Sequence, residues 1–308
     1  MVDMQTYRRR HSVIYGHTGD IIETSESSPK DGWLLLSLKI MGFDLHDHQW
    51  RELFVSRIKP IVWKPYLFTN LVLSERTKHI LRAMVPPPDR SEALITQEKP
   101  NLNQSSIILF HGGLGTGKTS AVEGLAEISQ KAIYRLTMAD IGTTAPDLEK
   151  AFKDAVNLTR TWNCIILIED ADVLVEKRSF QNMEGNAVVA TIIKLIDEFR
   201  GTLILTSTGE RVFDEVFRSC FDFRVQFQPP NMQEKVELWK RFLRESLTAQ
   251  EYNSIMQGEE LHELLESDLR IREMQKAVSV ARRLAMHAGY DMRQEDLVMA
   301  ITQIREFP

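Results

Sequence analysis

The stretch that most constrains the fold of this 308-residue chain is "GGLGTGKTS", residues 112–120. It fits the pattern G-x-x-x-x-G-K-[ST], whose defining positions are Gly112, Gly117, Lys118 and Thr119. The apolar run 107–110 precedes it, and a helix is predicted from Lys118 to about Ser129. Glycines let the backbone bend so that successive N–H groups point inward. A strand, a glycine loop and a helix in this order predict a phosphate-binding loop.

The parts of this loop have separate expected roles toward a nucleotide. The backbone N–H groups surround the phosphates, and the helix adds its positive N-terminal end. Lys118 is expected to reach the β- and γ-phosphates, and the Thr119 hydroxyl is expected to ligate Mg²⁺. The expected nucleotide-binding residues of the loop are Gly112, Gly113, Leu114, Gly115, Thr116, Gly117, Lys118, Thr119 and Ser120.

The pattern after residue 105 alternates between strands and helices, which predicts a parallel sheet covered on both faces. The further strands are expected at 132–136, 164–168, 202–206 and 223–227. Beyond residue 231 only helical patterns remain, at 232–246, 258–267, 269–288 and 293–307. Upstream, 33–43 and 49–55 predict two strands that form a hairpin, and a helix starts at Ser74. The sequence therefore predicts an α/β core followed by a helical domain.

The composition narrows the class of protein. The net charge is −5, which disfavours direct binding to nucleic acid. The only two cysteines, Cys164 and Cys220, show no metal-binding or disulfide pattern. No apolar run is long enough to span a membrane, and no signal peptide is visible. These features predict a soluble intracellular protein of the cytoplasm.

A second motif, "CIILIEDADVL" at 164–174, ends an apolar strand with two acids. By position Glu169 is the metal-binding acid and Asp170 the base that polarises the attacking water. The usual order is Asp then Glu, so here each carboxylate is displaced by one methylene, about 1 to 1.5 Å. A displacement of that size can cost about 10²-fold in rate. The alternative is a one-residue slip, in which Asp170 binds the metal and Asp172 assists.

Together with two further segments, these motifs resemble the AAA ATPases. The segments are "WNCIILIEDADVLVEKRS" and "GTLILTSTGERVFDEVFRSCFDFRVQFQPP". More narrowly they are similar to fungal AAA-type ATPases with "LLDEADVFLEKRS" and "LTTNRVERFDEAFRSRI", over about residues 35–305. The resemblance implies a P-loop core with a five-stranded parallel sheet in the order 5-1-4-3-2. It also implies a C-terminal helical lid, ATP with Mg²⁺, and a homo- or hetero-oligomeric ring.

On this basis the chain divides into four expected parts. They are a flexible N-terminal segment (1–32), a segment with the hairpin and helix (33–95), the nucleotide-binding core (96–230) and the lid (231–308).

Three positions depart from the family pattern. The acids are reversed, the polar sensor Asn becomes Thr208, and the second Arg of "FRSRI" becomes Cys220. Cys supplies no guanidinium to a γ-phosphate, so Arg218 becomes the candidate arginine finger. In the lid, Arg272 is the expected contact near the nucleotide. The resemblance thus gives as catalytic residues Asp170, Glu169, Thr208 and Arg218, and as metal ligands Thr119 and Glu169.

Two function classes follow. The first is an ATPase that hydrolyses ATP slowly with Mg²⁺ to remodel a protein partner, whose identity the sequence does not reveal. The alternative is a catalytically degenerate ATP-binding scaffold or regulatory subunit, because all three altered positions serve hydrolysis. A nucleic-acid helicase or clamp loader is disfavoured by the acidic net charge.

Overall fold

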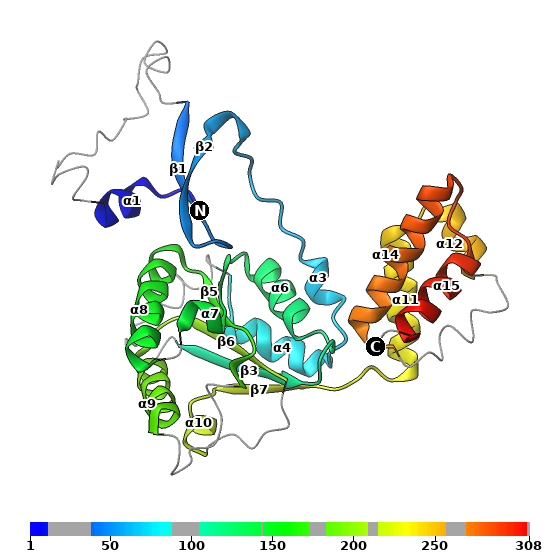
Figure 1. Cartoon of the computed structure of the whole chain (residues 1–308). Helices are drawn as coiled ribbons and strands as arrows, with labels where there is room; N and C mark the ends of the chain where they lie inside the picture. The colour runs from blue at the N-terminus through cyan, green and yellow to red at the C-terminus, as the bar shows by residue number, and fades with distance from the viewer. Residues whose placement is uncertain are drawn as a thin grey trace.

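The computed structural model describes residues 1–11, 38–87, 105–142, 144–172, 183–208, 215–256 and 269–306. A small hairpin, an α/β core and a helical lid follow one another along the chain (Figure 1). The predicted helix at 258–267 and most of the predicted flexible segment lie outside the described residues. None of the described helices is long and apolar enough to cross a membrane.

The core is built on a five-stranded sheet in the order β4-β5-β6-β3-β7. Its strands are β3 (Ser106–Gly112), β4 (Ile133–Leu136), β5 (Ile165–Ile168), β6 (Thr202–Ser207) and β7 (Phe223–Phe227). All four pairings between neighbours are parallel. Numbered within the core, this order reads 5-1-4-3-2 from the β7 edge, which confirms the expected topology.

Side chains alternate between the two faces along each strand, so both faces of this apolar sheet need cover. Helices supply that cover on both sides. On one face, Ile108 and Phe110 pack in a cluster with residues of α3 (Tyr66–Thr69), α4 (Glu75–Met84) and α6 (Lys118–Ser129). On the other face, Ile107 and Leu109 pack with residues of α8 (Ala145–Trp162) and α9 (Met183–Glu198). Short helices α7 (Met138–Ile141) and α10 (Glu215–Ser219) complete the described core.

The helix that precedes the core begins and ends where the sequence predicts. The Ser74 hydroxyl accepts a hydrogen bond from the Thr77 amide at 3.1 Å, which caps the first turn of α4. The helix ends at Met84, two residues before Pro86, as expected from the restriction that proline places on its neighbour.

The lid forms its own apolar core. Its described helices are α11 (Met232–Ser246), α12 (Ala249–Met256), α14 (Ile271–Ala288) and α15 (Gln294–Glu306). Trp239 and Met274 are almost completely buried between them. The helices stand beside the core, joined to it through the chain that leaves β7 (Figure 1).

The hairpin is confirmed, as β1 (Lys39–Asp44) pairs antiparallel with β2 (Gln49–Phe54), which leads into the 3₁₀ turn η2 (Val55–Arg57). The prediction of a flexible N-terminal segment is wrong for α1 (Met4–Arg10), which is helical. Asp3 caps this helix by accepting from the Thr6 amide at 3.0 Å. The same carboxylate accepts from the Trp162 indole nitrogen at 2.8 Å, which ties the helix to α8. A contact between residues 159 positions apart is invisible to local patterns.

Replacing Asp3 with Ala is expected to lower the free energy of unfolding by about 1 to 3 kcal/mol. The change removes a helix cap and leaves the Trp162 N–H without its partner. Urea denaturation would measure the effect, with Gln5→Ala, an exposed position in the same helix, as the matched control. Equal stability of the two variants would contradict this role of Asp3.

Candidate functional site

The phosphate loop leaves the carboxyl end of β3 and enters α6. Gly112, Gly115 and Gly117 have φ values of 149°, 73° and 96°, a region that side chains rarely adopt. A Cβ at Gly112 would lie 2.2 Å from the Phe227 carbonyl oxygen on β7. Glycine at this position is therefore required by both backbone conformation and space.

Lys118 is the buried cation of the loop. It is only 7% exposed, and its ammonium donates to the carbonyl oxygens of Gly112 at 2.7 Å and Gly113 at 2.8 Å. Burial lowers the pKa of Lys118, while the carboxylates of Asp170 and Asp172 act in the opposite direction. The charges of both acids therefore reach Lys118, whose ammonium is held by the carbonyls of its own loop.

The other predicted loop residues surround this cation. Thr116 is buried, and its hydroxyl donates to the Gly113 carbonyl at 2.8 Å, which stabilises the bend. Thr119 lies half-buried in the first turn of α6. Ser120 and Leu114 are exposed, and Leu114 at the tip of the loop is 62% exposed.

The two acids after β5 have different surroundings. Glu169 lies 3.6 Å from the guanidinium of Arg135 on β4 and is partly buried. Asp170 is exposed and has a left-handed backbone with φ of 50°. Its amide donates to the Thr206 hydroxyl at 3.1 Å, which stabilises this turn. Of these two acids only Asp170 is exposed, and its charge acts on Lys118.

Thr208 contacts Asp172 rather than either predicted catalytic acid. Both its amide, at 3.0 Å, and its hydroxyl, at 2.8 Å, donate to Oδ2 of Asp172. The Ser207 hydroxyl donates to Oδ1 of the same carboxylate at 2.7 Å. The end of β6 thus holds both oxygens of the Asp172 carboxylate in place.

The two candidate finger positions lie away from the loop. Arg218 is exposed on α10. Four residues further along the chain, the Asp222 carboxylate accepts a hydrogen bond from the amide of Ile107, at the amino end of β3. Since β3 and β7 are parallel, Arg218 lies toward the end of the strands opposite to the loop. Cys220 is partly buried against the apolar core, and burial raises the pKa of its thiol.

The lid reaches the loop through the start of α14. A Cβ built on Gly115 would lie 3.3 Å from the Cβ of Arg270 and 3.7 Å from that of Arg272. A Cβ on Gly117 would meet Ile271 at 3.6 Å. The structure therefore brings the start of α14, including Arg272, beside the loop; its contact with a nucleotide stays a prediction. The sequence did not single out Arg270 and Ile271, which carry no motif of their own.

A pocket of about 170 Å³ lies between the loop, the lid and the segment after α3. Its lining includes Leu71, Val72 and Leu73 from that segment, Gly117 from the loop and Ile271 from the lid. Sequence reasoning missed this pocket, because the apolar run "LVL" looks like ordinary core material. A mostly apolar cavity with a few polar groups, next to a glycine loop, is typical of a ligand-binding site.

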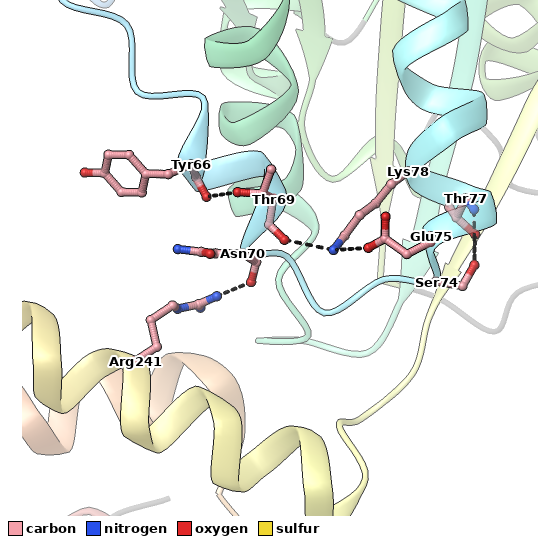
Figure 2. Close-up of polar contacts among 8 residues, drawn as sticks. All are labelled: Tyr66, Thr69, Asn70, Ser74, Glu75, Thr77, Lys78 and Arg241. Carbon is pink, nitrogen blue, oxygen red and sulfur yellow. Dashed lines mark hydrogen bonds and ion pairs between the residues drawn. The ribbon is translucent and has the colours of Figure 1, made fainter.

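Figure 2 shows how the segment beside this pocket is held. The Arg241 guanidinium on α11 donates to the carbonyl of Asn70. The Lys78 ammonium on α4, 5% exposed, donates to the Thr69 carbonyl at 2.9 Å and pairs with Glu75 at 3.0 Å. Two cations thus satisfy carbonyls at the end of α3, where the helix dipole is negative. Arg241 joins the lid directly to the wall of the pocket.

The glycine loop with Lys118 and the acids after β5 are groups that can bind a nucleotide together with a divalent ion. No group of three or more His, Cys, Asp or Glu side chains among the described residues could hold a metal unaided. A Mg²⁺ ion here would share its coordination between phosphate oxygens, water, a hydroxyl and one carboxylate. Thr119 with Glu169 or Asp170 can supply the last two.

Comparison with known proteins identifies a family match for the core of the chain. Residues 108–229 match the family described as "ATPase family associated with various cellular activities (AAA)". The chain contains an AAA ATPase domain. Domains of this family bind nucleotide, typically with Mg²⁺. The narrower resemblance to fungal proteins with the "LLDEADVFLEKRS" motif stays a prediction.

Two relatives illustrate how similar the sequence of this AAA domain is to those of known proteins. The ATPase family AAA domain-containing protein 3 of Caenorhabditis elegans is 28% identical over 207 residues, 62% of this chain and 34% of that protein. The peroxisomal ATPase pex6 of Schizosaccharomyces pombe is 27% identical over 201 residues, 60% of this chain and 19% of that protein. This chain therefore spans about a third or less of the length of these curated relatives.

A solved structure supports the fold of the AAA domain. The crystal structure of the FIGL-1 AAA domain aligns with a TM-score of 0.56, 78% of this chain and 84% of that chain being covered. The sequence identity is 15%, so the likeness concerns the fold alone.

Replacing Gly112 with Ala is expected to lower the free energy of unfolding by about 1 to 3 kcal/mol, because the new methyl group overlaps the Phe227 carbonyl. Gly113→Ala is the matched control, since a Cβ there would meet only Thr116 at an ordinary 3.7 Å. Thermal unfolding without nucleotide would measure both. A tolerated Gly112→Ala would show that β7 moves freely.

Proposed function

We propose that this AAA domain binds ATP with Mg²⁺ and hydrolyses it slowly to remodel a protein partner. The observation that carries the proposal is the buried Lys118 ammonium, which is held on two loop carbonyls and feels the charges of Asp170 and Asp172. A buried cation in a glycine loop at a helix start matches a polyphosphate ligand.

In this proposal the residues of the loop divide the work of binding. The amides of 113–119 surround the phosphates, and Lys118 exchanges its carbonyl partners for phosphate oxygens. The pocket at 71–73 takes the base and ribose, and Arg272 approaches from the lid. Thr119 and Glu169 would hold Mg²⁺, which neutralises charge on the phosphates.

The catalytic roles fall on a smaller set of groups. Asp170 would accept the proton of the attacking water, since its carboxylate is exposed and its charge reaches Lys118. Thr208 would act through Asp172, which its hydroxyl holds. Arg218, at the other end of the strands, would serve a neighbouring copy in a homo- or hetero-oligomeric ring.

Remodelling requires that the nucleotide state reach the rest of the molecule. The start of α14 lies against the loop, and Arg241 joins α11 to the Asn70 carbonyl at the pocket wall. A nucleotide between them would change the position of the lid relative to the core. This link supports an AAA domain in which the lid moves relative to the core when the nucleotide changes.

The second candidate is an ATP-holding scaffold or regulatory subunit with little hydrolysis. Specific contacts favour it: the Thr208 hydroxyl is bound to Asp172, Glu169 is bound to Arg135, and Cys220 supplies no guanidinium. Each of these reduces catalysis without affecting the loop.

Replacing Lys118 with Ala is expected to lower the affinity for a fluorescent ATP analogue at least about tenfold, because the loop loses its cation. Lys131→Ala is the matched control, since Lys131 is equally buried, at 7% exposure, at the far end of α6. Binding titrations would compare both variants at equal foldedness. Unchanged affinity in Lys118→Ala would remove the basis of the proposed function.

The double variant Glu169→Asp with Asp170→Glu is expected to raise ATP turnover by about 10-fold or more, since it restores the reach of both carboxylates. Steady-state phosphate release measures this. Adding Cys220→Arg tests the finger separately in mixed oligomers. Turnover that stays at background in both variants would favour the scaffold over the enzyme.

A further inference from the structure

Arg135 on β4 contacts two carboxylates at the border of the proposed metal site. Its Nη1 lies 3.6 Å from Oε1 of Glu169, and its Nη2 donates to Oε1 of Glu123 on α6 at 2.5 Å. The three side chains are 26% to 48% exposed, so solvent screens these ion pairs only in part. One guanidinium thus bridges the acid after β5 and the helix that carries the phosphate loop.

The strand register and the alternation of side chains bring Arg135 close to Glu169. Ile133 and Leu167, two residues before Arg135 and Glu169, pack in the cluster beneath α6. Because side chains alternate along a strand, Arg135 and Glu169 lie on this same face. The parallel register sets Arg135 opposite Leu167, which brings the guanidinium beside the end of β5.

The third member of the cluster, Glu123, lies on the helix that carries Thr119, a proposed metal ligand. Glu123 follows Thr119 by four residues on α6, so both lie on one side of that helix. The Arg135 guanidinium can therefore be held by Glu123 while Glu169 turns toward Thr119. A planar guanidinium with five N–H donors can keep one carboxylate when it releases the other.

We propose that Arg135 is a positioning residue that holds Glu169 away from the Mg²⁺ position, with Glu123 as the anchor that keeps the guanidinium when Glu169 is released. The proposal rests on the proposed function and adds a control of its metal dependence. Glu169 becomes a metal ligand only after its ion pair with Arg135 is given up, so Mg²⁺ affinity reflects the competition.

The two partners of Glu169 should then respond in opposite directions. In Arg135→Gln, Glu169 is free, and the Mg²⁺ concentration at half-saturation falls about two- to fivefold. In Glu123→Gln, Arg135 has only Glu169 left, and that concentration rises by a similar factor. The readout is fluorescence of a bound ATP analogue titrated with Mg²⁺, which needs no turnover.

A change of net charge alone would also lower the Mg²⁺ requirement in Arg135→Gln and raise it in Glu123→Gln. The Glu169→Gln background separates this explanation from an effect of Arg135 through Glu169. If Arg135 acts through Glu169, the Arg135→Gln effect disappears in the Glu169→Gln background. An effect that persists there would overturn the proposal. Arg135→Lys keeps the charge but loses the fork, and we expect it to shift Mg²⁺ affinity toward the Arg135→Gln value; wild-type behaviour would count against the bridge.

Two controls separate this proposal from the proposed function. Arg160→Gln removes an exposed arginine from α8 on the opposite face of the sheet, and its Mg²⁺ titration should match the wild type. Binding of the analogue is also measured in excess EDTA. A wild-type chain that binds no analogue under any condition contradicts the proposed function. Normal binding with identical Mg²⁺ titrations in all variants overturns the role of Arg135 alone.

Discussion

The parallel pairing of β3 with both β6 and β7 is the constraint on which the site depends. It aligns Gly112 with Phe227 and His111 with Ser207, so three strands end at one edge of the sheet. The Phe227 carbonyl then leaves no room for a side chain at Gly112. Because the strands are parallel, their carboxyl ends lie at one edge of the sheet. The glycine loop, the acids after β5 and the hydroxyls at the end of β6 therefore lie at that edge, although they are far apart in the sequence.

The converging groups form two sets with different contacts. The loop, its buried cation and its contact with α14 are the groups that would bind the polyphosphate in the proposed function. The groups for hydrolysis are engaged elsewhere: the Thr208 hydroxyl and Asp172 hold each other, and Glu169 is bound to Arg135. In the proposed function, a domain with this division would bind nucleotide through its backbone and regulate hydrolysis through a few side-chain contacts. Such contacts are each worth little energy, so they can be exchanged when ligands bind.

Local patterns predicted the elements whose ends depend on nearby residues. The helix Lys118–Ser129 follows directly from the loop, and α4 follows from the Ser74 cap. The same reasoning missed α1, whose cap residue Asp3 also needs Trp162, and it missed the pocket wall at 71–73. Those features depend on contacts between distant segments, as does the hold of Arg241 on Asn70 (Figure 2).

The sequence by itself determined the class of fold and the phosphate loop, because glycine spacing and alternating apolar runs act over a few residues. It also showed that the acid order, Thr208 and Cys220 depart from the family pattern. Only the tertiary structure decided what those residues touch. Strand register, side-chain alternation and the docking of the lid place Arg135 beside Glu169, Thr208 on Asp172 and Ile271 against the loop. These are long-range consequences of burying two sheet faces, and no local spacing encodes them.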